Sequence, residues 1–327
     1  MKKKIAFVTG GYSGEKVISY ESAKTIEAHV DRDLFDLYRI DIRTEGWFYN
    51  PDPKTYLPVD KNDFSIGVAG SKVTFDAVLC GIHGTPGEDG KLQGYFDLLG
   101  LPYSACGVAS SAITFNKRYT VAVAAFSNIP VAKSLHYFQS DEIDLDVVLK
   151  ELKLPYFVKP NNGGSSIGMS RVNEASQLDA AILKAFKEDD QILIEEYISG
   201  IELTIGVYRK GNDIITLPIT EIRSKKEFFD YEAKYTTGMA DEITPAPVSE
   251  SIAGLIRSQS EKLYRLFDCK GVVRIDFIYN LEEDKAYMLE INTVPGQSAN
   301  SLVPQQVKAA GSTMKDFYTA MIESCFD

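Results

Sequence analysis

Short apolar runs alternate with helix-like segments along the first third of the chain. Residues 15–30 and a segment from about residue 91 have the character of helices, and they separate apolar runs of strand length. Strands that alternate with helices are typical of a doubly wound parallel sheet. We therefore predict an N-terminal α/β domain over residues 1–116. Its predicted strands include "IAFV" (5–8), "FDLYRIDI" (35–42) and "DAVLCGI" (76–82).

The last third of the chain contains two apolar strands that are close in sequence. They are "GVVRIDFIYN" (271–280) and "KAYMLEINT" (285–293), and the short polar link "LEED" joins them. This arrangement predicts an antiparallel hairpin. A polar stretch without a regular pattern, residues 225–249, precedes the hairpin, and a helix that ends near residue 267 lies between the two.

Polar side chains interrupt both hairpin strands at a spacing of two residues. Arg274 and Asp276 therefore share one face of the first strand, and Glu290 and Asn292 share one face of the second, with Leu289 on the opposite face. If the register pairs the two carboxylates, they form one polar patch, whereas a slip of one residue separates them. Carboxylate and amide oxygens are ligands that Mg²⁺ prefers. An exposed sheet face with one charged pair is the alternative, and phosphate-binding features elsewhere favour the metal.

A loop rich in Gly, Ser and Asn follows a strand that ends at Lys159. In "KPNNGGSSIGMS" (159–170), successive backbone N–H groups can form an anion-binding nest, and glycine allows a phosphate to approach closely. The loop is not a Walker P-loop, because it lacks GKS or GKT and no helix opens directly after it. A flexible hairpin tip is the alternative. Lys117, at the start of a predicted helix, supplies a second cation and favours a nucleotide site.

Composition and charge limit the classes of partner. Hydrophobic residues make up 44% and charged residues 25%, as in a soluble globular protein, and the net charge is −11. An acidic chain without a basic run is not expected to bind nucleic acid or an anionic membrane. We see neither a signal peptide nor a membrane-length apolar run. The four cysteines are scattered without CxxC spacing, so we expect reduced thiols and a cytoplasmic location.

Taken together, seven segments in a fixed order carry a resemblance to a known family. The sequence resembles the D-alanine–D-alanine ligases of the ATP-grasp superfamily over essentially its whole length. The segments are "GGYSGE" (10–15), "HGTPGEDGKLQG" (83–94), "VKPNNGGSSIGMSRV" (158–172), "EEYISGIELT" (195–204), "DYEAKY" (230–235), "RIDF" (274–277) and "EINTVPGQSANSLVP" (290–304).

The resemblance implies a fold and an activity. After the N-terminal domain it implies a two-part ATP-grasp of α+β type with mostly antiparallel sheets, divided into residues 117–205 and 206–327, with 225–249 as a lid. ATP would phosphorylate a first D-alanine, and the amine of a second D-alanine would attack the acyl phosphate to give D-alanyl-D-alanine for peptidoglycan precursors. The implied cofactors are ATP and two Mg²⁺ ions, which Mn²⁺ can replace. The default assembly is a homodimer.

The resemblance also implies roles for individual residues. Metal ligands are Asp276, Glu290 and Asn292, with Glu290 bridging the two ions. Nucleotide-binding residues are Lys117, Lys159, Gly163, Gly164, Ser165, Ser166, Glu195, Glu196, Ile198, Glu202 and Lys234. Catalytic residues are Glu15, Ser165, Tyr235, Arg274 and Gly296, where Arg274 and the Gly296 amide stabilise the oxyanion. Substrate-binding residues are Glu15, His83, Arg274, Ser301 and Leu302, the last two at a helix N-terminus that suits a carboxylate.

Two departures and several alternatives remain at this stage. Asn116 stands where the family more often has aspartate, and Glu196 where some relatives have lysine. A ligase that makes D-alanyl-D-serine or D-alanyl-D-lactate is the nearest alternative, although Tyr235 favours an amine as the second substrate. A small-ligand binding protein or an NAD-dependent enzyme is the more distant alternative. "TGGYSGE" lacks the GxGxxG spacing of a dinucleotide site.

Overall fold

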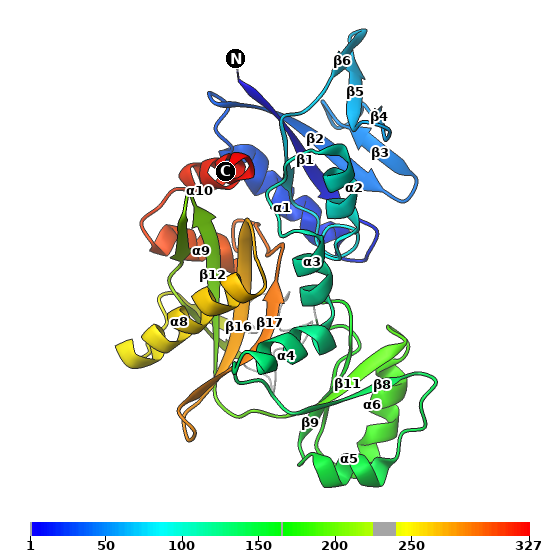
Figure 1. The fold of residues 1–327 in the computed structure, drawn as a ribbon, viewed down its shortest axis with the longest axis vertical. Coiled ribbons are helices and arrows are strands. Elements are labelled where there is room, and N and C mark those ends of the chain that lie inside the picture. Colours follow the sequence, from blue (N-terminus) through cyan, green and yellow to red (C-terminus); the bar gives the residue numbers. More distant parts are fainter. Residues whose placement is uncertain (1, 165, 225–239) are drawn as a thin grey trace.

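The computed structural model describes residues 2–164, 166–224 and 240–327. Three sheets and their helices form an elongated molecule (Figure 1). The sheet nearest the N-terminus lies at one end. The small sheet from residues 134–196, called the central sheet because of its place in the sequence, lies at the other end. The third sheet lies between them, beside α8 and α9. No helix in the described ranges is long and apolar enough to cross a membrane.

The first sheet has seven strands in a mixed arrangement, in the order β6-β5-β4-β3-β2-β1-β7. The end formed by β2, β1 and β7 is parallel, as predicted, because β1 pairs in parallel with both β2 and β7. Four short antiparallel strands, which the sequence pattern did not identify, extend it beyond β2. The strands are β1 (Lys3–Gly10), β2 (Phe35–Arg43), β3 (Gly46–Tyr49), β4 (Leu57–Asp60), β5 (Ser65–Val68), β6 (Ser71–Val73) and β7 (Ala77–Cys80).

Two helices pack against this sheet, α1 (Lys16–His29) and α2 (Lys91–Leu99). The next helix, α3 (Val108–Phe115), contacts α2 but packs mainly towards the third sheet, where Ile113 joins the core. The helix predicted at 15–30 is confirmed to within one residue at each end, and the helix expected from residue 91 begins there.

The second sheet is small and antiparallel, with the order β10-β9-β11-β8. Its helices cover one face and form a separate core with it, in which Val158, Ile182 and Ile194 are buried together. The elements are β8 (Ser134–Phe138), α5 (Leu145–Glu151), β9 (Tyr156–Pro160), β10 (Ser170–Val172), a short 3₁₀ turn (Ala175–Gln177), α6 (Leu178–Ala185) and β11 (Gln191–Glu196).

The third sheet is antiparallel and holds the predicted hairpin as β16 and β17. The long strand β12 lies beside β16 and pairs on its other side with β13 and β14. The strands are β12 (Ile201–Lys210), β13 (Asp213–Thr216), β14 (Thr220–Ser224), β15 (Ala240–Ile243), β16 (Val272–Asn280) and β17 (Lys285–Asn292). The helices are α4 (Lys117–Phe126), α8 (Glu250–Leu266), α9 (Leu302–Ala309), α10 (Met314–Glu323) and a terminal 3₁₀ turn (Ser324–Phe326).

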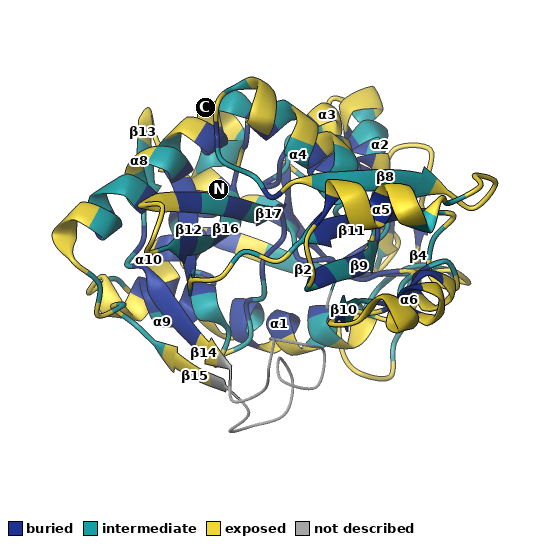
Figure 2. Ribbon diagram, turned by 90° about the horizontal axis from the view of Figure 1, so that it is seen from below, coloured by how far each residue is buried: buried dark blue, intermediate teal, exposed yellow. Residues whose placement is uncertain are grey.

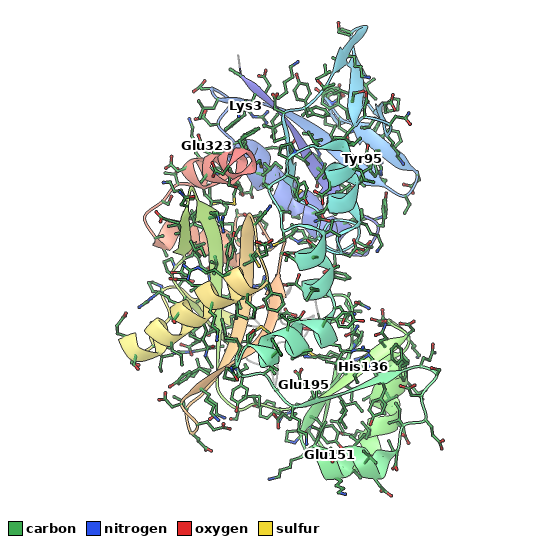
Figure 3. The ribbon with its side chains drawn as sticks, in the orientation of Figure 1. Lys3, Tyr95, His136, Glu151, Glu195 and Glu323 are labelled. Carbon is green, nitrogen blue, oxygen red and sulfur yellow. The ribbon has the colours of Figure 1, made fainter. Side chains whose placement is uncertain are left out.

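The last helix packs against the first domain. Phe317 and Met321 of α10 share a core with Ile5 and Phe7 of β1, and Lys3 lies over the ring of Phe326. In Figure 3, Lys3 and Glu323 are labelled at the same end of the molecule. Figure 2 shows β12, β16 and β17 of the third sheet mainly in the buried and intermediate colours, whereas α5 and α8 expose their outer faces. The first and third sheets therefore share a core. The division of the chain at residues 116 and 205 stays a prediction.

A glutamine from α9 closes a gap in the third sheet. Between the stretches where β12 pairs with β14 and with β13, Gly206 N–H donates to Gln306 Oε1 at 2.8 Å. The same amide donates through Nε2 to the Thr204 carbonyl and to Thr220 Oγ1, at 3.1 and 3.0 Å. Gln306 is fully buried. Its amide therefore bonds to the backbone of β12 and to a side chain at the start of β14, and it fixes α9 on the sheet.

We predict that Gln306→Ala lowers the free energy of unfolding by about 3 kcal/mol, because buried polar groups of the sheet lose their partners and a cavity is left. Urea denaturation followed by circular dichroism measures the change. Gln139→Ala, at an exposed glutamine, is the control and should change stability by less than about 0.5 kcal/mol. Equal stability of the two variants would contradict this role of Gln306.

Candidate active site

The hairpin register brings the predicted metal ligands together. Asp276 lies directly opposite Glu290, and Arg274 lies opposite Asn292, so the register that the sequence analysis required is confirmed. Asn292 Nδ2 is 3.2 Å from Asp276 Oδ2 and 3.5 Å from Glu290 Oε1. The two carboxylates and the amide therefore face one point between the strands.

A β-bulge changes the face of one neighbouring residue. Asp276 pairs with Glu290, but the next residue of β16, Phe277, pairs with Met288, so Leu289 is the extra residue. The expectation that Leu289 faces away from the polar patch is wrong, since it lines the same pockets as Glu290. The physical reason is the bulge, because an extra residue breaks the alternation of faces along a strand and redirects its side chain.

Arg274 holds the first carboxylate in an ion pair. Its Nε and Nη2 donate to the two oxygens of Asp276 at 2.9 and 2.7 Å, and Thr204 Oγ1 donates to Oδ1 at 2.5 Å. Asp276 is only 8% exposed. Arg274 Nη2 is also 4.0 Å from Glu290 Oε1, so one guanidinium neutralises part of the charge of both carboxylates.

The donor set fits a hard divalent cation. Two carboxylates and an amide are oxygen donors of the kind that Mg²⁺ and Mn²⁺ accept, and a half-turn of the Asn292 amide would present its oxygen instead of Nδ2. In the described part of the chain, no three His, Cys, Asp or Glu side chains form a group suited to a metal. A metal site here therefore depends on Asn292 as its third protein ligand.

The two predicted phosphate lysines approach the Gly-rich loop from different elements. Lys117, the first residue of α4, donates from Nζ to the Gly163 carbonyl at 2.6 Å. Lys159, at the end of β9, donates from Nζ to Glu195 Oε1 at 2.7 Å, and both side chains are nearly buried. Glu195, predicted as a nucleotide-binding residue, therefore also orients a lysine.

Asparagines account for the geometry at the start of α4. The Arg118 N–H donates to Asn161 Oδ1 at 2.9 Å, and the Lys117 N–H donates to the Asn161 carbonyl at 3.0 Å. Asn116 caps the helix by accepting from Tyr119 N–H at 3.1 Å, so asparagine serves here where aspartate was more expected. These N–H groups of the first turn of α4 already have protein partners. The group that this helix start can offer to a phosphate is therefore the Lys117 side chain. The sequence analysis did not identify Asn161, whose buried contacts depend on a distant helix.

Glu196, the second departure, has a structural role. Its carboxylate accepts from the Lys133 N–H at 2.7 Å, and its own N–H donates to the Lys133 carbonyl at 2.9 Å. These bonds tie the end of β11 to the segment before β8. Glu196 thus fixes the end of β11, which lines the pocket described next.

A pocket of about 500 Å³ collects most of the predicted nucleotide-binding residues. In Figure 3, Glu195 lies where the central sheet faces the rest of the molecule. The predicted residues that line this pocket are Lys117, Lys159, Gly163, Gly164, Ser166, Glu195, Glu196, Ile198, Glu202, Asp276 and Glu290. Ser165, Lys234 and Tyr235 lie outside the described residues, as does most of the predicted lid.

A second pocket, of about 800 Å³, collects the predicted substrate-binding residues. These are Glu15, His83, Arg274, Gly296, Ser301 and Leu302, together with Asn292. Lys117, Gly163, Asp276 and Glu290 line both pockets. The two pockets therefore meet at the hairpin and the Gly-rich loop.

Glu15 reaches between two glycine loops. A β-carbon on Gly164 would lie 2.9 Å from Glu15 Oε1, and one on Gly84 would lie 2.5 Å from Oε2. Gly84 also has a positive φ of 69°, which favours glycine there, whereas a side chain at position 164 would displace the Glu15 carboxylate. Glu15 precedes α1 by one residue, and its carboxylate comes to lie beside the Gly-rich loop although 149 residues separate Glu15 from Gly164 in the sequence (164 − 15).

His83 and Glu88 enter the second pocket from the loop after β7. Burial lowers the pKa of His83 to about 4, so its ring is neutral at pH 7. Burial, with the nearby charge of Glu15 as a smaller cause, raises the pKa of Glu88 to about 8. Glu88 accepts from the Gly84 N–H at 2.6 Å, which organises this loop.

The N-terminus of α9 borders the far side of the second pocket. Ser301 is its N-cap residue, but its hydroxyl bonds to Ser298 Oγ at 2.7 Å and makes no capping bond. Gln305, one turn later, donates to Glu242 Oε2 at 2.6 Å. A helix start with its side-chain cap directed elsewhere suits the binding of a carboxylate.

Comparison with known proteins identifies relatives of the whole chain. A family model described as "D-ala D-ala ligase C-terminus" matches residues 117–323, and one described as "D-ala D-ala ligase N-terminus" matches residues 4–106. A D-alanine–D-alanine ligase of Azobacteroides pseudotrichonymphae is 44% identical over 323 residues, covering 98% of this chain and 99% of that protein. One from Parabacteroides distasonis is 43% identical, covering 99% and 97%.

Solved structures agree with these relatives. The VanG D-Ala:D-Ser ligase of Enterococcus faecalis superposes with a TM-score of 0.87 at 29% identity, covering 99% of this chain and 100% of that one. The D-alanyl-alanine synthetase A of Vibrio cholerae superposes with a TM-score of 0.88 at 27% identity, covering 100% and 99%. The family models and the full-length relatives together show that the chain belongs to the D-alanine–D-alanine ligase family.

Proposed function

We propose that the protein uses ATP to join two D-alanines into D-alanyl-D-alanine, with release of ADP and phosphate, for peptidoglycan precursor synthesis. The observation that supports this proposal is the junction of the two pockets, whose shared lining includes Lys117, Asp276 and Glu290. A nucleotide in one pocket and an amino acid in the other would place a phosphate and a carboxylate next to each other there.

The nucleotide occupies the pocket between the central and third sheets. Its phosphates face Lys117, Lys159 and the Gly-rich loop, which offers cations and backbone N–H groups. Glu202 on β12 is the partner of the ribose, and the backbone near Ile198 borders the adenine. Tight positioning and charge neutralisation are the main contributions of a protein to phosphoryl transfer.

Asp276, Glu290 and Asn292 would hold the magnesium ions. Bound Mg²⁺, or Mn²⁺ in its place, supplies neutralisation of the phosphate charge. Arg274 already balances these carboxylates in the structure and remains a cation at the same junction.

In the first step, a carboxylate oxygen of the first D-alanine attacks the γ-phosphorus of ATP. The bond between this phosphorus and the bridging oxygen breaks, ADP leaves, and D-alanyl phosphate forms. Glu15 binds the ammonium of this D-alanine, and Arg274 lies beside the reacting carboxylate. The resemblance to the family also links Glu15 to the catalytic residues Ser165 and Tyr235, and we propose the same link here.

In the second step, the amine of the second D-alanine attacks the acyl carbon of D-alanyl phosphate. The carbonyl electrons move to oxygen, and Arg274 and the Gly296 N–H stabilise this oxyanion. The carbon–oxygen bond to phosphate then breaks, and the attacking amine loses a proton. The carboxylate of the second D-alanine binds at the start of α9, near Ser301 and Leu302.

A ligase that makes D-alanyl-D-serine is the second candidate, because VanG, a D-Ala:D-Ser ligase, has the same fold at 29% identity. We place the protein in the cytoplasm, where ATP is available, and propose a homodimer as the default assembly. We also propose the division into residues 1–116, 117–205 and 206–327, with 225–249 as the lid.

We predict D-alanyl-D-alanine as the main product when the protein receives ATP, Mg²⁺ and D-alanine together with equal D-serine or D-lactate. Mass spectrometry identifies the product, and phosphate release measures the rate. If D-alanyl-D-serine or D-alanyl-D-lactate were the main product, the protein would belong to a neighbouring class of ligase. A change in nicotinamide absorbance without phosphate release would refute the ligase function.

We predict that Glu290→Gln reduces Mg²⁺-dependent turnover by about a hundredfold or more, because a metal and phosphate site loses a charged ligand. The fold should remain, since Glu290 is partly exposed. Glu282→Gln, at the exposed tip of the same hairpin, is the control and should keep turnover within twofold. Wild-type turnover in Glu290→Gln would defeat the metal assignment.

The lowered pKa of His83 predicts a pH dependence of stability. Between the unfolded pKa of about 6.5 and the folded pKa of about 4, the unfolded chain binds more protons than the folded one, so stability falls as pH falls. From pH 7 to pH 4, the wild type should lose about 3 kcal/mol more than His83→Gln. Urea titrations at both pH values measure the difference, and parallel losses would show that His83 ionises normally.

A further inference from the structure

The segment 294–297 follows β17 and carries Gly296, the proposed donor to the oxyanion. Its position cannot come from strand pairing, because β17 ends at Asn292. Glu88 Oε1 instead accepts the Val294 N–H at 3.1 Å, while the other oxygen of Glu88 accepts the Gly84 N–H. The Glu88 carboxyl group therefore links the start of this segment to the loop after β7.

Ser22 holds the other end of the same segment. Its Oγ, on α1, accepts the Gln297 N–H at 3.1 Å and lies 3.1 Å from His83 Nε2. Ser22 is fully buried, and His83 is 6% exposed. The residue directly after Gly296 is thus fixed to the first helix of the chain.

These contacts determine which nitrogen of His83 carries the proton. A backbone N–H can only donate, so Ser22 Oγ accepts from Gln297. Within the described ranges, His83 Nε2 is the one remaining hydrogen-bonding neighbour of this buried hydroxyl, and a buried O–H needs an acceptor. Nε2 is therefore unprotonated, and the neutral ring carries its proton on Nδ1.

The backbone of Val294 influences the His83 ring from its other side. It raises the pKa of the ring, as an acceptor near a ring N–H does, while burial lowers that pKa more strongly. The Val294 N–H already donates to Glu88, so the group that can accept the ring proton is the Val294 carbonyl.

We propose that the side chains of Ser22, His83 and Glu88 form a clamp that positions the Gly296 amide, and that His83 acts as a neutral strut in it. This inference rests on the proposed function, because it assigns the Gly296 N–H to the oxyanion. It replaces the direct substrate contact that the resemblance implies for His83. The three are positioning residues, which act through segment 294–297.

The first test reads the tautomer in the wild-type protein without substrate. The chain has three histidines, so NMR of ¹³C,¹⁵N-histidine-labelled protein gives few ring signals, and His83→Gln assigns that of His83. A neutral ring protonated on Nδ1 at pH 7 is expected. A ring protonated on Nε2, or a cation, overturns the clamp.

The second test removes the hydroxyl at the centre of the clamp. Ser22→Ala should speed amide hydrogen exchange in a peptide that covers 294–297 and lower kcat about tenfold, with the Kd of ATP unchanged within twofold. Ser260→Ala is the matched control, because Ser260 is also fully buried and donates only to the Ile256 carbonyl in α8. It should change neither exchange in this segment nor kcat.

The outcomes separate the clamp from the proposed function. Unchanged exchange in Ser22→Ala, or faster exchange with unchanged kcat, overturns the positioning role. A kcat loss matched by Ser260→Ala also overturns it, since the effect would then come from general destabilisation. Failure of the wild type to form any dipeptide refutes the proposed function, whereas the histidine signals and the exchange data still decide whether the clamp exists.

Discussion

Two carboxylates that face each other across neighbouring strands place the main constraint on this structure. Asp276 and Glu290 are direct cross-strand neighbours, and like charges in such a pair repel. Arg274 offsets this repulsion by contact with both, and Thr204 donates a further hydrogen bond to Asp276. A divalent cation would offset it more fully, so the arrangement is already suited to a positively charged partner.

The same hairpin explains why the two pockets meet. Its polar face forms the wall that the proposed nucleotide pocket and the proposed substrate pocket share, and the bulge at Leu289 lets an apolar side chain join that wall. Elements from three parts of the chain complete the junction. Glu15 arrives from the first sheet, Lys117 from α4 and Lys159 from the central sheet. Chemistry at the junction therefore requires all three sheets to be in place.

Long-range hydrogen bonds give this junction its precision. Gln306 attaches α9 to β12, Asn161 attaches the start of α4 to the end of β9, and Ser22 attaches the segment after β17 to α1. Each of these side chains is fully buried, where an unmade hydrogen bond costs about 1–3 kcal/mol. Buried polar groups thus fix the relative positions of these elements. Packing of apolar side chains alone would define those positions less specifically.

Local pattern in the sequence was sufficient for the helix at 15–30, the hairpin, and the common face of Asp276 with its partners, because side-chain period and turn length are local properties. The motifs also identified the family. The antiparallel strands β3–β6, the bulge at Leu289 and the roles of Asn161 and Ser22 could not be predicted in this way. Ser22 and Gln297 are 275 residues apart, and only the folded chain brings them into contact. Which buried donor meets which acceptor is decided by packing between distant segments, and no local pattern records it.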